Sequence, residues 1–278
     1  MKLGSIVAAA AALAALGACK PAQNGSASAA AAPTIIGVTA TEYAFQAPDT
    51  VPAGNVTFRL HNAGTMLHHV QIVRLDSGRT MADFGAAMHG DGPPPAWVRM
   101  LGGPNAVVPG DSTDDIVSLQ PGDYVMLCVI PGSDGQPHVA KGMMRPFHVG
   151  PATTAAAMPT ADAVLTLSDY DFQFSTPVTA GRRTIEVVNA GPQPHEMILA
   201  QLAPGKTAQQ VVDWVVGGMQ GPPPGRPIGG TVGLAVGARN TITASFTPGD
   251  YALICFVSDA RDGRPHAAHG MVKQFKVS

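Results

Sequence analysis

Charge is scarce in this sequence. Only 13% of its 278 residues are charged, with 17 basic against 19 acidic side chains, and no basic run is present. The electrostatic footprint of a nucleic-acid-binding protein is therefore missing, and we expect no nucleic-acid partner. The low charge does not predict disorder, because 45% of the residues are hydrophobic and can build a core.

Long helical stretches are also lacking. The chain contains 32 Gly and 25 Pro, which favour turns and short strands, so an all-helical bundle is excluded. Beyond the N-terminus no segment approaches the roughly 20 apolar residues that span a bilayer, and we expect that part to be soluble. No carboxylate pair and no Ser, His and Asp arrangement stands out for hydrolysis.

One short apolar run stands at the N-terminus. Residues 1–18 combine the single basic residue Lys2 with an apolar stretch too short to span a bilayer, which is typical of a secretory signal peptide. The ending Leu-Gly-Ala-Cys resembles a bacterial lipobox. This resemblance implies lipidation at Cys19, and hence a lipoprotein on the extracytoplasmic, periplasmic side of a bacterial membrane. The alternative is an ordinary signal peptide that leaves Cys19 as a free thiol.

The residues after Cys19 favour a flexible connection to the membrane. Residues 19–33 are a low-complexity tether rich in Ala and Ser. Lys20, directly after the cysteine, resembles the sorting signal of outer-membrane lipoproteins in Gram-negative bacteria.

The rest of the chain is an internal repeat. Residues 41–64 match residues 168–191, and the same separation of 127 residues links the Pro-Gly-Asp-Tyr motifs that end at Tyr124 and Tyr251. Such a fixed separation predicts two copies of one domain, at 34–150 and 162–278. The Pro-, Ala- and Thr-rich residues 151–161 are the predicted linker.

Each copy has the pattern of a β-sandwich with one short helix. In the first copy, strand-like runs rich in β-branched residues occupy 34–40, 55–62, 69–75, 114–119, 123–130 and 145–149. Thr80 and Thr207 begin capping-box patterns, which predict one short helix after each. Gly-Pro-Pro-Pro runs at 92–95 and 221–224 predict loops.

The residues that recur best are of metal-ligand type. They are His68, Cys128, His138 and Met143 in the first copy, and His195, Cys255, His266 and Met271 in the second. Two imidazoles, a thiolate and a thioether suit copper, because soft sulfur stabilises Cu(I) and imidazole suits both oxidation states. A single buried cysteine or histidine is usually a packing residue. Packing alone does not explain why all four recur together at separations of 127 or 128 residues.

These motifs resemble those of cupredoxins, the blue-copper β-sandwich proteins, over residues 34–278. Shared features include Asn-Ala-Gly before the first histidine and Pro-Gly-x-Tyr before the cysteine. The resemblance implies an all-β fold of two tandem Greek-key β-sandwiches, each with one short inserted helix. It also implies up to two copper ions per chain, one type 1 site per domain, held by the eight residues above. The spacing after each cysteine is most similar to the type 1 site of copper nitrite reductases.

Other histidines and methionines are not expected to be ligands, because none has a counterpart of its own type in the other copy. His69, for example, aligns with Glu196 and points away from the face of His68. The residues set aside in this way are His69, His89, Met144, His148 and His269. A disulfide between Cys128 and Cys255 is disfavoured, because it would join two equivalent interior positions of different sandwiches.

Extra histidines typical of copper enzymes are missing. Leu127 and Ile254 precede the two cysteines, where multicopper oxidases and nitrite reductases carry histidine, and no His-x-His pair occurs. The sequence thus predicts an electron-transfer protein that is not an enzyme, with a redox protein of unknown identity as its partner. The alternatives are a non-redox copper-binding or copper-delivery lipoprotein and a cupredoxin-fold interaction module.

Overall fold

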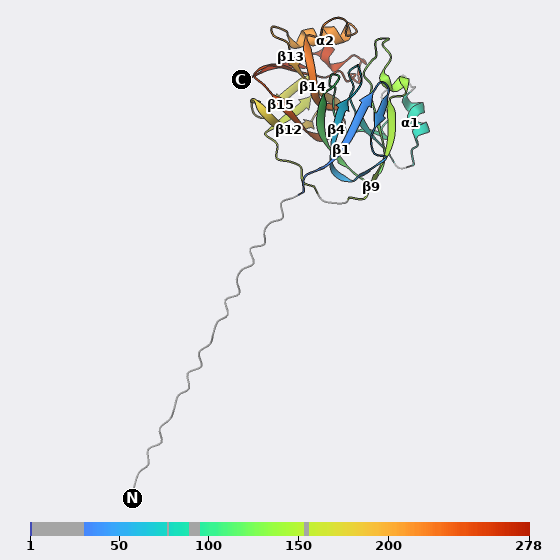
Figure 1. Cartoon of the computed structure of the whole chain (residues 1–278), viewed down its shortest axis with the longest axis vertical. Coiled ribbons are helices and arrows are strands. Elements are labelled where there is room, and N and C mark those ends of the chain that lie inside the picture. Colours follow the sequence, from blue (N-terminus) through green and yellow to red (C-terminus); the bar gives the residue numbers. More distant parts are fainter. Residues whose placement is uncertain (2–30, 77, 89–94, 153–155) are drawn as a thin grey trace.

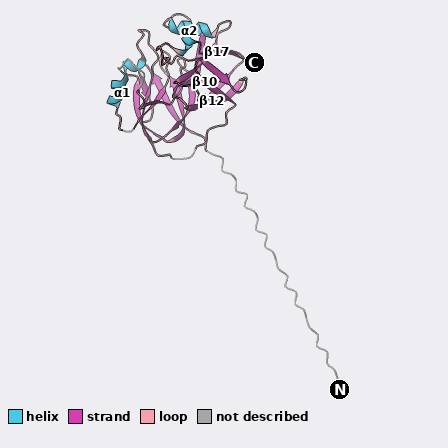
Figure 2. Ribbon diagram, turned by 180° about the vertical axis from the view of Figure 1, so that it is seen from behind, coloured by secondary structure: helices cyan, strands magenta, loops and turns pink. Residues whose placement is uncertain are grey.

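The computed structural model describes residue 1 and residues 31–76, 78–88, 95–152 and 156–278. The predicted signal peptide, Cys19 and His89 lie outside the described residues, as does most of the predicted tether. The described part consists mainly of strands, with two short helices on the outside (Figures 1 and 2). The predicted all-β fold with one short helix per copy is therefore confirmed. Within this part, no helix has the length and apolar character needed to cross a membrane.

The elements of the first half, residues 31–152, follow the repeat. They are β1 (Thr34–Thr41), β2 (Ala44–Gln46), β3 (Thr50–Pro52), β4 (Gly54–Asn62), β5 (Gln71–Leu75), α1 (Met81–Met88), β6 (Val98–Met100), β7 (Ser112–Leu119), β8 (Gly122–Leu127), the 3-10 helix η1 (His138–Lys141) and β9 (Met144–Gly150).

The second half, residues 156–278, has corresponding elements. They are β10 (Ala163–Ser168), β11 (Asp171–Phe174), β12 (Gly181–Asn189), β13 (His195–Leu202), α2 (Ala208–Val216), β14 (Gly225–Leu234), β15 (Arg239–Phe246), β16 (Gly249–Ile254), the 3-10 helix η2 (His266–His269) and β17 (Val272–Val277).

Each half is a sandwich of two layers of strands. The first half packs β2-β1-β4-β7 against β3-β9-β8-β5-β6, and the second packs β11-β10-β12-β15 against β14-β13-β16-β17. The repeat in the sequence is thus also a repeat in strand order. The predicted boundaries at 34–150, 151–161 and 162–278 stay predictions.

The two halves share one sheet. Strand β7 pairs antiparallel with β15, so that Asp115 lies opposite Ile242 and eight strands form a continuous layer. Beside this pairing, residues 101–107 of the first half bridge to β14, for example through Pro104 and Thr231. We call residues 101–107 together with β14 the seam.

Strand alternation gives β8 two buried faces. Tyr124, Met126 and Cys128 belong to the core between the two layers of the first half, as the alternating pattern predicts. Val125 and Leu127 face the other way, into a smaller core under α1. Strand β8 is therefore covered on both sides, which fixes the position of the cysteine that follows it.

The capping signals are confirmed at both helices. The Thr207 hydroxyl accepts a hydrogen bond from Gln210 N, and the Gln210 side chain accepts one from Thr207 N. Thr80 and Asp83 exchange the same pair of bonds at the start of α1. Strand β14 is not predicted by the sequence, because its glycines and Pro227 weaken the strand pattern.

Candidate metal centres

Three segments bring the first set of predicted ligands together. Cys128 follows β8 directly, His138 begins η1, and His68 precedes β5. Val139 N donates a hydrogen bond to Cys128 O at 2.7 Å, and Met143 N donates to His138 O at 3.0 Å. These backbone bonds fold the chain after Cys128 back upon itself, so that the cysteine, histidine and methionine lie close together.

The second half builds the same loop. Cys255 follows β16, His266 begins η2, and His195 begins β13. Ala267 N donates to Cys255 O at 2.8 Å, and Met271 N donates to His266 O at 3.0 Å. The loop closes in the same way although it has one residue more between cysteine and histidine than in the first half.

In each half two imidazoles and one thiol form a buried group. The candidate ligand atoms of each group lie within 4.8 Å of one another, and Sγ and Nδ1 are separated by 3.5 Å in Cys128–His138 and by 3.3 Å in Cys255–His266. All six side chains are fully buried. We call His68, Cys128 and His138 the first centre, and His195, Cys255 and His266 the second centre.

The ligand atoms require a partner that the surrounding protein does not supply. Within the described part of the chain, Nδ1 of His68 is buried without a hydrogen-bond partner. In the second centre Nδ1 of His195 faces Nδ1 of His266 at 3.0 Å. A buried polar atom without a partner costs about 1–3 kcal/mol. A cation held by the Nδ1 atoms and the thiolate would remove this cost, so the residues fit a bound metal ion.

The two methionines lie beside the cysteines. Met143 and Met271 are fully buried, and each belongs to the same core cluster as the cysteine of its half. The backbone oxygen of each methionine accepts a hydrogen bond from that cysteine's N–H at 3.2 Å. Their role as weak ligands stays a prediction.

Burial keeps the ligands of both centres neutral. Burial, together with the neighbouring imidazole of the same centre, lowers the pKa of His138 and His266 to about 4. Burial also raises the pKa of the Cys128 thiol to about 11, and that of Cys255 is raised as well. Burial disfavours the charged form in both cases. A bound cation reverses this preference for the thiolate, and the thiol proton is released on binding.

A carboxylate stands behind the first imidazole of each centre. Glu42 Oε1 lies 3.4 Å from His68 Nε2, and Asp169 Oδ1 lies 2.9 Å from His195 Nε2. The Thr65 backbone N–H binds the Glu42 carboxylate and is the main reason why its pKa is lowered to about 2. A carboxylate on one nitrogen orients the ring and leaves the other nitrogen for a metal. The sequence analysis did not identify Glu42 and Asp169, although the two residues occupy corresponding positions of the repeat.

The Asn-Ala-Gly motif brings the chain close to the same imidazole. Asn62 Oδ1 accepts a hydrogen bond from Gly64 N at 3.0 Å, and Asn189 does the same for Gly191. A Cβ atom at Gly64 would lie 2.8 Å from His68 Nε2, and the corresponding distance at Gly191 is 2.5 Å. Glycine is therefore required at both positions for the histidine to keep its place.

A tyrosine covers the second imidazole of each centre. Tyr43 and Tyr170 have φ angles of 64° and 66°, in the left-handed region that side chains rarely adopt. Their rings meet those of His138 and His266 edge to face, with centroids 5.2 and 5.8 Å apart. A left-handed non-glycine residue costs about 1–3 kcal/mol. The same strained conformation occurs at corresponding positions of the two halves, which associates it with the two centres.

Of the histidines that were set aside, His69, His148 and His269 are described, and they lie outside both centres. His148 is exposed and pairs with Asp123 at 2.9 Å. His269 belongs to a third group of possible ligands together with Asp259 and Asp262. Asp259 is already occupied by the guanidinium of Arg261 and the hydroxyl of Tyr170. This third group is therefore satisfied without an ion.

His69 is a buried residue whose role the sequence did not reveal. Its Nε2 accepts a hydrogen bond from Val129 N at 2.9 Å, and it is not part of either centre. The disfavoured disulfide does not form, because Cys128 and Cys255 are both free and lie in different cores.

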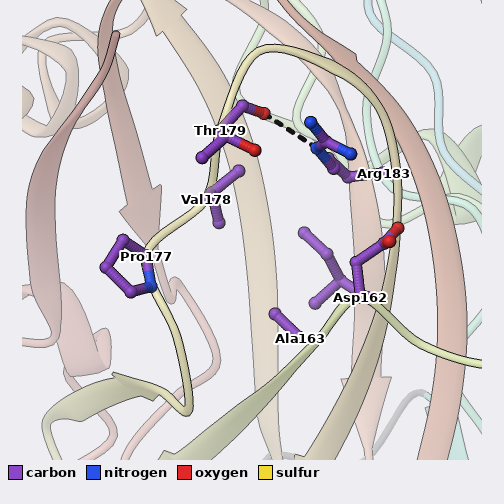
Figure 3. A pocket seen from close by; sticks show the side chains of 7 residues that line it. Asp162, Ala163, Pro177, Val178, Thr179 and Arg183 are labelled. Atoms are coloured by element: carbon purple, nitrogen blue, oxygen red, sulfur yellow. Dashed lines mark hydrogen bonds between the residues drawn. The ribbon is translucent and has the colours of Figure 1, made fainter.

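A small surface pocket lies at the start of β10, next to the loop before β12 (Figure 3). Arg183 closes one side of it with a hydrogen bond to Thr179 O at 3.1 Å. No ligand of either centre lines this pocket, and its residues suggest no chemistry related to the metal centres.

Comparisons with known proteins find similar solved structures. No family model matches the sequence, and neither does any curated protein. The structure resembles an auracyanin from Roseiflexus castenholzii, with 26% identity over 44% of this chain and 100% of that one, and a TM-score of 0.31. A multicopper oxidase is 16% identical over 88% of both chains, with a TM-score of 0.27. TM-scores of this size assign no function.

A third similar structure corrects one expectation. A copper-containing nitrite reductase from Thermus scotoductus is 15% identical over 88% of this chain and 61% of that one, with a TM-score of 0.24. Enzymes thus stand beside the auracyanin among the similar structures. The prediction that the chain is not an enzyme is contradicted. The missing histidines would serve only one kind of additional copper site. Their absence therefore does not decide whether the chain is an enzyme.

Proposed function

We propose that this cupredoxin-like chain binds up to two copper ions, one at each centre, and transfers electrons outside the cytoplasm while tethered to a membrane. In this proposal the halves at 34–150 and 162–278 are domains with one type 1 copper site each. Bound copper would supply a one-electron Cu(II)/Cu(I) couple. The protein supplies the ligands and holds them in a rigid, dry sandwich.

One observation carries the proposal. Two groups of the same composition, each with two imidazoles and one thiol, are fully buried at equivalent places in the two halves. The set is soft enough for Cu(I), and its imidazoles also accept Cu(II). In this proposal Met143 and Met271, which are both buried, act as weak fourth ligands. Copper is therefore the metal that best fits the donor set.

Burial of the ligands favours electron transfer over copper delivery. All six imidazole and thiol ligands have no exposed surface, so a partner protein could not exchange ligands with the metal directly. An electron needs no such contact. The non-redox delivery alternative is for this reason the weaker one.

The test is metal content together with colour. The purified protein, loaded with copper and oxidised, should bind close to two copper ions and absorb strongly in the visible range. Cys128→Ala and Cys255→Ala should each remove one copper and part of the absorption, because the charge-transfer band requires the thiolate. His148→Ala, which changes an exposed histidine outside both centres, is the matched control and should keep both ions. A colourless protein that binds copper would refute the electron-transfer proposal.

The proposed location has a separate test. Cys19→Ser should release the protein from bacterial membranes into the soluble fraction with its copper content unchanged, since lipid chains on this residue would provide the anchor. Persistence in the membrane fraction would contradict the proposed anchor. We propose the outer membrane as the site of attachment, on the basis of Lys20, and fractionation of inner and outer membranes tests this.

A further inference from the structure

Two residues at one repeat position connect the centres to the seam. His69 and Glu196 are both buried. His69 Nε2 accepts a hydrogen bond from Val129 N, and Glu196 Oε1 accepts one from Phe256 N, both at 2.9 Å. Val129 and Phe256 are the residues that directly follow the centre cysteines, so each contact reaches the backbone beside a candidate thiolate.

The same two residues also contact the thiols through their own backbone. Glu196 N donates to Cys255 Sγ at 3.4 Å. The backbone of His69 makes the equivalent hydrogen bond to the Cys128 thiol. Each residue thus touches its centre twice, once at the sulfur and once at the following amide.

Asn105 joins the two residues across the seam. Its Nδ2 donates to Glu196 Oε2 at 3.2 Å and to Thr231 O at 3.1 Å. On the other side, Val70 N donates to Pro104 O at 2.9 Å and Val107 N donates to His68 O at 3.3 Å, which places Asn105 beside His69, and its side chain is hydrogen-bonded to the His69 ring. Asn105 Oδ1 accepts a hydrogen bond from Ala106 N at 2.7 Å. Because Nε2 of His69 accepts a backbone hydrogen bond, the neutral ring carries its proton on Nδ1 and is the donor toward the Asn105 side chain. Asn105 has 1% of its surface exposed, so water does not interrupt this contact.

The difference between the two repeat positions has a chemical reason. An asparagine side chain has one accepting end and one donating end. His69 offers it a donor and Glu196 offers it an acceptor, so a single asparagine matches both. With two histidines, Nδ2 of Asn105 would keep only its backbone acceptors, and with two glutamates its oxygen would keep only the Ala106 N–H. His69 and Glu196 thus differ between the two copies in the way that a hydrogen-bonded link between the halves requires.

We propose that His69, Asn105 and Glu196, which we call the bridge, carry electrons between the two centres. The inference rests on the proposed function, in which both centres hold copper. The step is the transfer of one electron from the reduced copper of one centre to the oxidised copper of the other, with no bond or proton transferred. A continuous, buried hydrogen-bond network is the kind of contact through which two sites can be coupled.

The experiment measures internal electron transfer in the full-length, copper-loaded protein. A brief pulse of reductant, smaller than the copper content, reduces part of the copper, and absorbance then follows its redistribution between centres. The Cys128→Ala and Cys255→Ala variants provide the reference spectrum of each centre. We expect Asn105→Leu, a change of similar volume, to slow redistribution by about tenfold or more. The spectrum and reduction potential of each centre should stay as in the wild type.

Gln71→Met is the matched control. Gln71 is a buried amide in the same region, and its Nε2 donates to Gly233 O across the seam at 3.0 Å. Its side chain donates to Ile72 O, Gly102 O and Gly233 O and to no ligand of either centre. We expect wild-type redistribution in this variant. Equal slowing in Gln71→Met and Asn105→Leu would show a general effect of the seam and would overturn the proposal.

Two further results would also overturn it. These are a wild-type protein in which the centres do not redistribute electrons internally, and an Asn105→Leu variant that redistributes them at the wild-type rate. If Asn105→Leu fails to fold, Glu196→Gln decides, because a glutamine cannot accept from both Phe256 N and Asn105 without a mismatch. Slower redistribution with unchanged spectra would support the bridge, and an unchanged rate would refute it. Failure of the proposed function is distinguishable, because the protein would then be colourless before any kinetic measurement.

Discussion

His195 places its Nε2 2.9 Å from the carboxylate of Asp169, whereas the corresponding His68 lies 3.4 Å from Glu42. The second centre also has Asp259 3.8 Å from His266 Nε2. The corresponding imidazole of the first centre has the cationic Lys141 nearby, which helps to lower its pKa. Carboxylates therefore lie close to both imidazoles of the second centre but to only one of the first. Arg261 offsets part of this charge at the second centre, and Asp134 offsets Lys141 at the first.

This difference predicts that the second centre has the lower reduction potential. Negative charge stabilises Cu(II) more than Cu(I), so the Cys128→Ala variant, which keeps only the second centre, should be harder to reduce than Cys255→Ala. Optical redox titration of the two variants measures both potentials. Equal potentials, or the reverse order, would contradict the electrostatic argument.

Asp169→Asn should raise the potential of the second centre. Removal of such a supporting carboxylate costs about 10–100-fold in metal affinity. If the loss affects only Cu(II), the potential rises by roughly 60–120 mV, at 59 mV per tenfold change. Glu186→Gln, which alters a carboxylate paired with Arg239 at the surface, is the control. A rise of the same size in that variant would refute a local effect.

Met143→Leu and Met271→Leu should leave copper bound and raise the potential of the altered centre. A weak thioether donor stabilises Cu(II) more than Cu(I), and leucine fills a similar volume in the core. His138→Ala and His266→Ala should instead lose copper, because a strong ligand is removed. Metal analysis after dialysis compares the four variants. Copper loss from the methionine variants equal to that from the histidine variants would contradict the weak-ligand role.

Gly64→Ala should weaken copper binding in the first centre. The added Cβ would lie 2.8 Å from His68 Nε2 and 2.6 Å from Glu42 Oε1, and such overpacking costs about 1–3 kcal/mol. Gly37→Ala is the matched control, because nothing lies within 4 Å of a Cβ at that position. Copper titration and thermal unfolding measure both variants. Wild-type affinity and stability in Gly64→Ala would show that the imidazole is free to move.

Asp115→Asn should change how stability depends on pH. Burial raises the pKa of Asp115 from 3.8 to about 7, while Thr231 and Asn240 donate to one of its oxygens. The unfolded chain loses this proton near pH 4, and the folded chain keeps it up to about pH 7, so this group lowers stability as pH rises between those values. Asparagine removes that loss. The stability of Asp115→Asn relative to the wild type should therefore grow from pH 4 to pH 7 in thermal unfolding of the metal-free proteins. A constant difference would contradict this.

The sequence predicts the fold and the grouping of metal-ligand residue types because both leave periodic traces. Alternation in β8 places Cys128 in the core, and the repeat pairs it with Cys255. Residues that make a single contact across the seam leave no such periodic trace. Asn105 has no asparagine counterpart 127 residues later, and His69 differs from Glu196. The role of these residues depends on which strands pair with one another. The decisive pairing is that of β7 with β15, and no local sequence pattern predicts it.

That pairing has a consequence for the integrity of the whole molecule. If the chain were cut between its halves, β7 and β15 would each expose a row of unpaired amide and carbonyl groups at an open edge, and such edges promote association with other chains. Buried polar groups between the halves, such as Asp115 and Asn105, would meet water at the same time. We therefore expect the two halves to unfold together in one cooperative transition. The separated halves should aggregate rather than persist as independent folded units.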